Sequence, residues 1–313
     1  MALEGHILEV MATSVAAVCD EFVAHVSKMN ILLQIIRMRF VTVATQSDGY
    51  FEYLIQSCKR NNIQLDVLGW GMKWSGWVWR IDLVREYLES LCKNEIVCFI
   101  DAYDVIMLHD SSVIEKRFLN SYARIVVAQD LNVSFFKEAV ARFKFGICKR
   151  VRINAGTYIG YVSDILWMIN AMCTLNDCSI DRKLDDQKMM TQLCGLLPDL
   201  FKIDTSRSIF LCISYHGDMC KSGITVTDKK RLLYKGAVDP CILHGAGKAN
   251  LDGVISSLGY NIILNSKITQ FHVKKKHCLY SSIAIVVIIV FVAVVLLSKN
   301  RVKLSFKGKS VMF

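Results

Sequence analysis

The segment Ile96–His109 reads IVCFIDAYDVIMLH. Its first five residues are apolar and rich in β-branched and aromatic side chains, which is typical of a buried strand in a parallel sheet. Asp101 and Asp104 follow on either side of Tyr103, and a second apolar run comes next. Open α/β sheets bind their ligands where such strands end. The segment therefore favours a divalent cation held by carboxylates and shared with a nucleotide diphosphate, although loops after strands also carry aspartate for turn formation.

The chain contains enough apolar material for a sizeable core. It has 313 residues, of which 53% are hydrophobic, so we do not expect a disordered chain. The net charge is +10, but residues 271–313 hold eight basic and no acidic side chains, which leaves +2 (10 minus 8) for the first 270 residues. We therefore expect no nucleic-acid partner for the globular part.

The twelve cysteines show no metal-binding or redox spacing. No two of them form a C-x-x-C pair, and Cys98, Cys148, Cys212 and Cys241 lie in or beside apolar runs. We expect most cysteines to be small buried thiols in a reducing environment rather than disulfides.

The order of elements predicts a β-α-β start. Residues 1–37 carry apolar side chains at helical spacing, which predicts an amphipathic extension that packs as a lid rather than binding a membrane or a partner, and we expect no secretory signal there. Arg39–Thr45 is β-branched and alternating, Tyr50–Asn61 is helical in pattern, and Ile63–Leu68 reads as a second strand. A β-α-β unit implies parallel strands with a right-handed crossover.

Tryptophan is concentrated in one loop. Gly69–Trp79 reads GWGMKWSGWVW and holds four of the chain's five tryptophans. Such a loop forms either a stacking surface for a planar ligand or a plug against the core, and composition does not decide between them. Ile81–Leu91 predicts a helix that leads into the strand at Ile96.

Two segments after the organising strand predict further strands. Arg124–Ala128 reads as a strand, and Ile153–Val162 as a strand pair or turn. Gly156 and Gly160 in the second segment allow either close approach of a ligand to the backbone or a bulge.

Two later segments place chemically useful side chains at element ends. Leu184–Cys194 predicts a helix with Asp185 and Asp186 in its first turn, where the helix dipole alone already favours acidic residues. Cys241–Gly247 runs from an apolar strand into a His-Gly turn. His244 is therefore either a metal ligand or a structural histidine.

The C-terminal region predicts a membrane anchor. Residues 279–298 (Leu279 to Ser298) carry no charge, and a helix of that length spans a bilayer. We expect a globular domain at 38–265, a basic linker at 266–278 and a short basic tail at 299–313. Because basic residues lie on both sides of the span, orientation is open. A single-pass anchor with a cytosolic domain is the default, and an ER or Golgi lumenal domain is the alternative.

Six blocks of sequence resemble the glycosyltransferase domain of the procollagen lysyl hydroxylase/glycosyltransferase (PLOD-like) family, in the family's order and over about residues 39–260. FIDAYDVIM is the most specific match. The blocks are VTVAT at 41–45, LGWGMKW at 68–74, FIDAYDVIM at 99–107, NAGTYIGY at 154–161, DDQ at 185–187 and HGAG at 244–247.

This resemblance implies a GT-A-type, Rossmann-like α/β domain with a mixed sheet, in which Mn²⁺ or Mg²⁺ assists hexose transfer from UDP-glucose or UDP-galactose to a protein or glycan acceptor, such as hydroxylysine of a collagen-like protein. It implies that Asp101, Asp104 and His244 bind the metal, and that Asp185 and Asp186 face the sugar or the acceptor hydroxyl as catalytic residues. The implied cofactor-binding residues are Thr45, Trp74, Arg80, Tyr103, Asn154, Gly245, Gly247 and Lys248, with Tyr103 and Trp74 on either side of the uracil and Thr45 at the nucleoside.

The implied chemistry is physically consistent. A cation offsets the negative charge that develops on the departing diphosphate, and a carboxylate near the sugar can orient it, stabilise positive charge or accept a proton. The chain departs from the family where Asn250 replaces a lysine, with Lys248 two residues earlier, and in the loop before Asn154. The alternative is a catalytically degenerate, membrane-anchored binding or structural protein.

Overall fold

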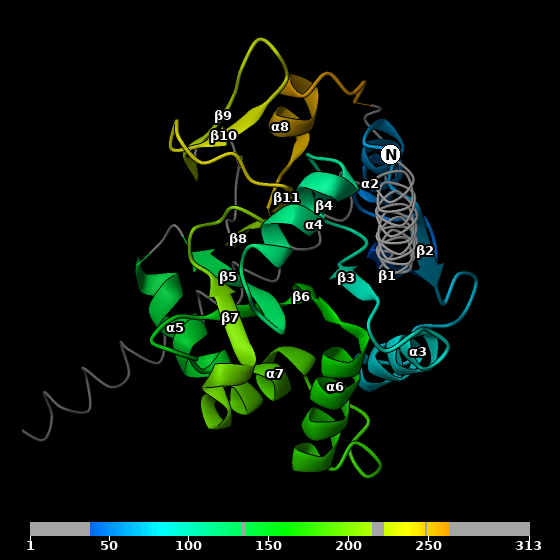
Figure 1. Cartoon of the computed structure of the whole chain (residues 1–313). Helices are drawn as coiled ribbons and strands as arrows, with labels where there is room; N and C mark the ends of the chain where they lie inside the picture. The colour runs from blue at the N-terminus through cyan, green and yellow to red at the C-terminus, as the bar shows by residue number, and fades with distance from the viewer. Residues whose placement is uncertain (1–37, 133–134, 215–221, 248, 263–313) are drawn as a thin grey trace, which may run out of the picture. The chain divides into compact units, whose positions relative to one another are not determined.

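A mixed β-sheet runs through the part of the chain that the computed structural model describes, which is residues 38–132, 135–214, 222–247 and 249–262 (Figure 1). Within these residues the sheet has nine strands in the order β2-β1-β3-β6-β5-β8-β11-β4, with β7 paired to β5, and β9 and β10 form a separate hairpin. The strands are β1 (Met38–Val43), β2 (Leu65–Leu68), β3 (Ile96–Ile100), β4 (Val105–Met107), β5 (Ile125–Asn132), β6 (Ile153–Tyr161), β7 (Phe201–Asp204), β8 (Phe210–Ser214), β9 (Ile224–Val226), β10 (Leu232–Tyr234) and β11 (Ile242–His244).

The first three strands confirm the predicted β-α-β start. β1 pairs in parallel with β2 and with β3, and the connections are α2 (Phe51–Arg60) and α3 (Trp77–Glu89). Helix α3 begins four residues earlier than predicted. Three of the four added residues are apolar, and Val78 among them is completely buried. Gly76 before the helix has a φ of 103°, which glycine tolerates best.

Strand β6 differs from its prediction. The sequence suggested a strand pair or turn, but Ile153–Tyr161 is one nine-residue strand, antiparallel to both β3 and β5. A bulge, one of the two explanations offered for its glycines, is present within it, because the β6 partners of Val127 and Ala128 are Tyr158 and Asn154. The intervening residues 155–157 are therefore displaced from the ladder with β5.

Two hydrophobic cores lie on opposite faces of the sheet, because side chains alternate along each strand. Val97 and Phe99 of β3 pack in the first core, together with α3, α6 and α7. Cys98 and Ile100 of β3 pack in the second core, together with α2 and α4. The remaining helices among the described residues are α4 (Ser111–Leu119), α5 (Phe135–Phe145), α6 (Val162–Asn176), α7 (Asp186–Leu196), α8 (Asp252–Ser257) and the short 3₁₀ helix Pro198–Leu200.

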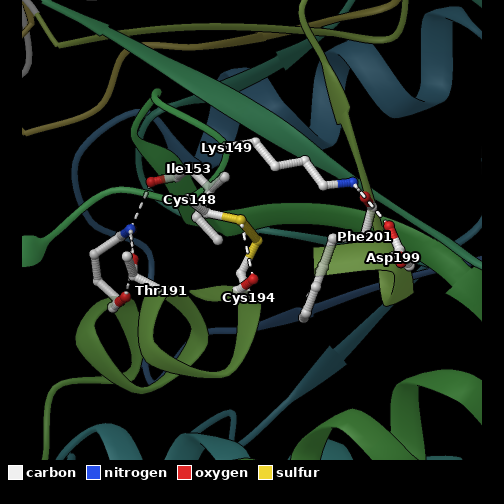
Figure 2. The surroundings of a disulfide bond; sticks show 8 residues. Cys148, Lys149, Ile153, Thr191, Cys194, Asp199 and Phe201 are labelled. Atoms are coloured by element: carbon white, nitrogen blue, oxygen red, sulfur yellow. Dashed lines mark hydrogen bonds and ion pairs between the residues drawn. A yellow bond between two sulfur atoms is a disulfide. The ribbon is translucent and has the colours of Figure 1, made fainter. Parts of the chain in front are cut away.

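Most of the cysteines within the described residues are buried free thiols, and one pair is bonded. Cys98, Cys212 and Cys241 are buried free thiols, as predicted. The prediction is wrong for Cys148, which forms a disulfide with Cys194 across 46 residues, with 5.7 Å between the two Cα atoms (Figure 2). Sequence spacing does not reveal this pair, because the two segments meet only when α7 packs against β6.

The disulfide fastens the last turns of α7 to the segment that leads into β6. Lys149, beside the disulfide in Figure 2, donates from Nζ to the Phe201 carbonyl at 3.1 Å. The position of α7 is thus fixed near its C-terminal end by one covalent link, and the segment that holds this link is itself bonded to the start of β7.

The terminal predictions lie outside the described residues. These are the helical extension at 1–37 and the segments at 266–278, 279–298 and 299–313. Within the residues that are described, no helix has both the length and the apolar character needed to cross a membrane.

Candidate active site

Strand pairing brings two aspartates and a distant histidine to one place. Asp101 directly follows β3, Asp104 directly precedes β4, and His244 ends β11. Because β11 runs antiparallel to β4, His244 lies opposite Val105. The Gly245 N–H donates to the Asp104 carbonyl at 2.8 Å, which fixes the turn after β11 against the turn before β4.

Asp101, Asp104 and His244, which we call the metal cluster, converge closely. The Nε2 atom of His244 lies 3.1 Å from Asp104 Oδ1 and 3.6 Å from Asp101 Oδ2. One ligand atom from each residue falls within 4.8 Å of the others. The imidazole is almost completely buried, whereas the two carboxylates keep 28% and 18% of their side-chain surface exposed. A ligand arriving from solvent therefore meets the carboxylates first.

Gly156 of β6 makes room for this cluster. The Asp101 N–H donates to the Gly156 carbonyl at 2.7 Å, and a Cβ atom at Gly156 would lie 2.2 Å from Asp101 Oδ2 and 2.7 Å from His244 Cε1. Both contacts are too short for any side chain. Asn154 supports the bulge by accepting the Gly156 N–H at its Oδ1, 2.7 Å away.

The donor atoms of the metal cluster fit a small divalent cation. Two carboxylates supply hard oxygen ligands, and one imidazole supplies nitrogen, a combination that suits Mn²⁺ and Mg²⁺ better than a soft thiophilic metal. Gly156 packs closely against Asp101 and the His244 ring, and a side chain at this position would displace the ligand atoms. The cluster is therefore a candidate metal site, made of the three ligands that the family resemblance implied.

Burial and neighbouring charges shift the pKa values of His244 and Asp101. Burial lowers the pKa of His244, but Asp104 and Cys212 raise it more, so that it lies well above its usual value. Burial raises the pKa of Asp101, and Arg80 and His244 offset only part of that increase. A cation bound through the imidazole replaces a proton, so metal binding here is linked to proton release.

Arg80 joins the metal cluster to a second carboxylate. Its Nη1 donates to Asp101 Oδ1 at 2.5 Å, and its Nη2 donates to Asp186. The guanidinium also lies 4.8 Å from the ring centroid of Trp77 and 5.3 Å from that of Phe99. Burial lowers the pKa of Arg80, but Asp186 and Asp101 raise it more. We call Arg80 and Asp186 the arginine cluster.

The two predicted catalytic acids, Asp185 and Asp186, have different contacts at the start of α7. Asp185 is the N-cap, and its side chain accepts the Lys188 N–H at 3.1 Å, so its oxygen already has a structural role. Gln187, to which the sequence gave no role, anchors this turn to β6. Its Oε1 accepts the Ala155 N–H at 2.8 Å, and its Nε2 donates to the Ile153 carbonyl. Of the two acids, only Asp186 is connected to the metal cluster, because it accepts a hydrogen bond from Arg80, which also donates to Asp101.

The family assignment rests on a match to the sequence profile described as "PLOD GT domain", which covers residues 35–263. The chain belongs to this family of glycosyltransferase domains. The mixed α/β sheet implied by the resemblance is confirmed.

Individual relatives are distant. The chain is 25% identical over 165 residues to the multifunctional procollagen lysine hydroxylase and glycosyltransferase of Caenorhabditis elegans, covering 49% of this chain and 22% of that protein. It is 26% identical over 241 residues to the procollagen-lysine,2-oxoglutarate 5-dioxygenase of Drosophila melanogaster, covering 69% of this chain and 31% of that protein. The chain thus spans less than a third of either relative.

A solved structure also resembles the chain. It is described as the galactosyltransferase LGTC in complex with donor and acceptor sugar analogues, and it matches with a TM-score of 0.41 and 16% sequence identity. The match covers 75% of this chain and 100% of that chain.

In this PLOD GT domain, aromatic residues line the neighbourhood of Thr45. The Thr45 N–H donates to the Tyr103 hydroxyl at 3.1 Å, and the Thr45 carbonyl accepts the Gly71 N–H at 2.9 Å. Trp70 stacks on Phe51, with 5.1 Å between the ring centroids and 53% of Trp70 exposed, and Phe51 in turn contacts Tyr103. The start of the tryptophan loop therefore lies beside Thr45 and Tyr103, whereas Trp79 at its end packs against the core. Stacking on a planar ligand stays a prediction, and Phe51 is a contact that the sequence did not single out.

Trp74 belongs to a different aromatic group. It packs edge-on against Trp77 and Trp79, with centroid distances of 5.1 and 5.5 Å, and remains 43% exposed. Its placement opposite Tyr103 across a uracil stays a prediction.

The turn after His244 is described only in part. Gly247 has a φ of 82°, which explains why glycine is needed at that position. Lys248 lies outside the described residues, so its role at the diphosphate remains a prediction.

Proposed function

We propose that this chain is a metal-dependent glycosyltransferase that moves a hexose, either glucose or galactose, from a UDP-sugar to an acceptor hydroxyl. The observation that carries the proposal is the convergence of Asp101, Asp104 and His244 beside Gly156. A family member that had lost its activity would have little reason to keep three ligand-type side chains together against the cost of placing like charges side by side.

The metal cluster and the arginine cluster are proposed to have different roles in the transfer. Asp101, Asp104 and His244 would hold Mn²⁺ or Mg²⁺, which would offset the charge developing on the departing diphosphate. Arg80 keeps a fixed positive charge next to Asp101 and orients Asp186. The carboxylate of Asp186 would then face the hexose and either orient it or stabilise positive charge at its anomeric carbon.

The nucleoside would bind along the aromatic residues beside Thr45. Trp70 is about half exposed there, and exposed indole rings offer apolar area for stacking on a planar base. The acceptor is proposed to be a hydroxyl group of a protein or glycan, with hydroxylysine of a collagen-like protein as the first choice because the relatives' names refer to procollagen lysine.

The test is UDP release from UDP-glucose and from UDP-galactose by the purified chain, with and without Mn²⁺. We expect release with at least one donor, dependence on the cation, and loss of release in Asp101→Ala and Asp104→Ala. If the wild-type chain neither binds UDP nor hydrolyses either donor with Mn²⁺ present, the proposed activity is wrong and the binding or structural alternative replaces it.

The location of the domain is a separate proposal. Residues 279–298 are proposed to anchor the chain in a membrane. The Cys148–Cys194 disulfide favours the lumenal alternative over the cytosolic default, because disulfides persist in oxidising compartments. Protease protection of a tag placed after Phe313, together with thiol labelling of the disulfide pair in cells, tests both points.

A further inference from the structure

A thiol lies directly behind the histidine of the metal cluster. In the register of three neighbouring strands, Cys212 of β8 pairs with His244 of β11, which pairs with Val105 of β4. The Sγ atom of Cys212 lies 3.6 Å from Nδ1 of His244. The cysteine is completely buried, and the histidine is 2% exposed. The contact is therefore enclosed by protein and shielded from solvent.

The two ring nitrogens of His244 have distinct surroundings. Nε2 faces the carboxylates of Asp104 and Asp101, so it is the atom that can reach a shared cation. An imidazole that offers its Nε2 lone pair to a metal carries the ring proton on Nδ1. In a buried site that N–H needs an acceptor, because an unpaired buried donor is costly. Sγ of Cys212 is placed to be that acceptor.

We propose that Cys212 is a positioning residue for the metal site. Its sulfur accepts the Nδ1–H of His244, which holds the ring in the orientation that aims Nε2 at the cation. Metal-ligating histidines generally have such a partner on the other ring nitrogen, and loss of the partner weakens metal binding by about 10- to 100-fold. This inference rests on the proposed function, because it concerns the metal that the transferase would use.

The same core offers a matched control. Cys241 is also a completely buried free thiol, and it packs in the same hydrophobic core as Cys212. It lies three residues before His244 along the chain, whereas Cys212 reaches the ring from the neighbouring strand. Cys241→Ala removes the same atom from the same core, so it reports the packing cost of losing a buried sulfur.

The test measures Mn²⁺ binding to the full chain through the electron paramagnetic resonance signal of free Mn²⁺. Thermal unfolding of each variant is recorded in parallel. We expect Cys212→Ala to raise the dissociation constant for Mn²⁺ by about tenfold or more. Cys212→Ser, which retains an acceptor, should recover most of the affinity. Cys241→Ala should lower the melting temperature about as much as Cys212→Ala does, with Mn²⁺ affinity within about twofold of the wild type.

Activity provides a second measurement. At saturating Mn²⁺, Cys212→Ala should regain most of the wild-type kcat for UDP release, because the change affects occupancy of the site rather than the chemistry. If Cys212→Ala does not fold, Cys212→Val replaces it, since valine fills the space without offering an acceptor.

The outcomes separate the two proposals. Wild-type affinity in Cys212→Ala, or an equal loss in Cys241→Ala, would overturn the positioning role while leaving the proposed function intact. Absence of Mn²⁺ binding by the wild-type chain would overturn the proposed function, and the positioning role would fall with it.

Discussion

The metal cluster and the arginine cluster are neighbours, yet the fold holds them by different means. Asp101, Asp104 and His244 stand at the ends of strands, where the backbone pairing of β3, β4 and β11 sets their positions. Arg80 and Asp186 stand in the first turns of α3 and α7. The place of α7 depends on Gln187 at one end and on a disulfide at the other. Because the two clusters are held in different ways, a substitution in the arginine cluster should impair sugar transfer without impairing cation binding.

The largest expected effects come from removing one carboxylate from each cluster. Asp104→Asn should abolish measurable Mn²⁺ binding and lower UDP release by about 1,000-fold, or roughly 4 kcal/mol of barrier. Asp186→Asn should lower release by a similar factor while Mn²⁺ affinity stays within about threefold, because this residue reaches the metal cluster only through Arg80. Mn²⁺ titration and steady-state kinetics on the same samples measure both.

A control for that pair lies one residue away. Asp185→Asn keeps the helix cap, because asparagine caps helices as well as aspartate does, and it should lose less than tenfold in release. If Asp186→Asn loses Mn²⁺ binding as completely as Asp104→Asn, the two clusters act as one unit and the comparison fails.

The next largest effect concerns the link between the clusters. Arg80→Met should lower the free energy of unfolding by about 3 kcal/mol, because it leaves Asp101 and Asp186 without their shared positive charge. Urea unfolding measures the loss. Added Mn²⁺ should restore part of it, since a cation on Asp101 replaces some of the missing charge.

Arg80→Lys sharpens this prediction. A lysine ammonium cannot donate to both carboxylates in the fixed geometry of a guanidinium, so it should recover less than half of the lost stability. Full recovery of the unfolding free energy with lysine would mean that the positive charge alone joins the clusters, and that the two simultaneous hydrogen bonds of the guanidinium are not needed.

The disulfide should matter for the arginine cluster alone. Replacing both Cys148 and Cys194 with serine should lower the free energy of unfolding by about 2–3 kcal/mol, because the open loop gains conformational freedom in the unfolded chain. UDP release should fall at temperatures where α7 loosens, with Mn²⁺ affinity unchanged. A reductant should lower the melting temperature of the wild type and leave that of the double variant as it was. If the reductant lowered the melting temperatures of both proteins equally, its effect would not come from the Cys148–Cys194 disulfide.

The sequence pointed to the residues of both clusters, but it did not predict the contact that joins Arg80 to Asp186. Asp101 and Asp104 follow an apolar strand within four residues, and His244 ends another strand, so local pattern and family resemblance identified them. The contact between Arg80 and Asp186 joins the starts of two helices far apart in the chain. The Cys148–Cys194 pair depends on the same helix packing. Local pattern specifies elements and their ends, whereas partners across helices are decided by tertiary packing.

The roles within the DDQ block show this limit at single residues. The sequence placed Asp185 and Asp186 together as catalytic acids. In the structure the first caps α7, and the second turns inward to Arg80. Adjacent residues at a helix start point in different directions, and which of them faces a site depends on how the helix is rotated against the sheet.

The smallest expected effect is a pH dependence near the metal cluster, where the described residues contain no disulfide that supports the strands. Asp239, just before β11, contacts Nε2 of His109 at 3.0 Å and accepts from Arg231 at 2.5 Å. Burial raises the pKa of Asp239, but His109 and Arg231 lower it more, so the pKa lies below its usual value. Because the folded pKa is depressed, the stabilisation is present above the unfolded pKa, near 3.9, and is lost as the pH falls through the folded value.

Asp239→Asn should therefore cost about 0.5–1 kcal/mol of unfolding free energy at pH 7, and the difference from the wild type should shrink as the solution is acidified below pH 4. Urea unfolding of both proteins across this range measures it. An equal cost at pH 3 and pH 7 would mean that Asp239 supports β11 by packing rather than by charge. The pairing of β11 with β4 would then be enough to hold His244 against Asp104, and the charge of Asp239 before the start of β11 would not contribute.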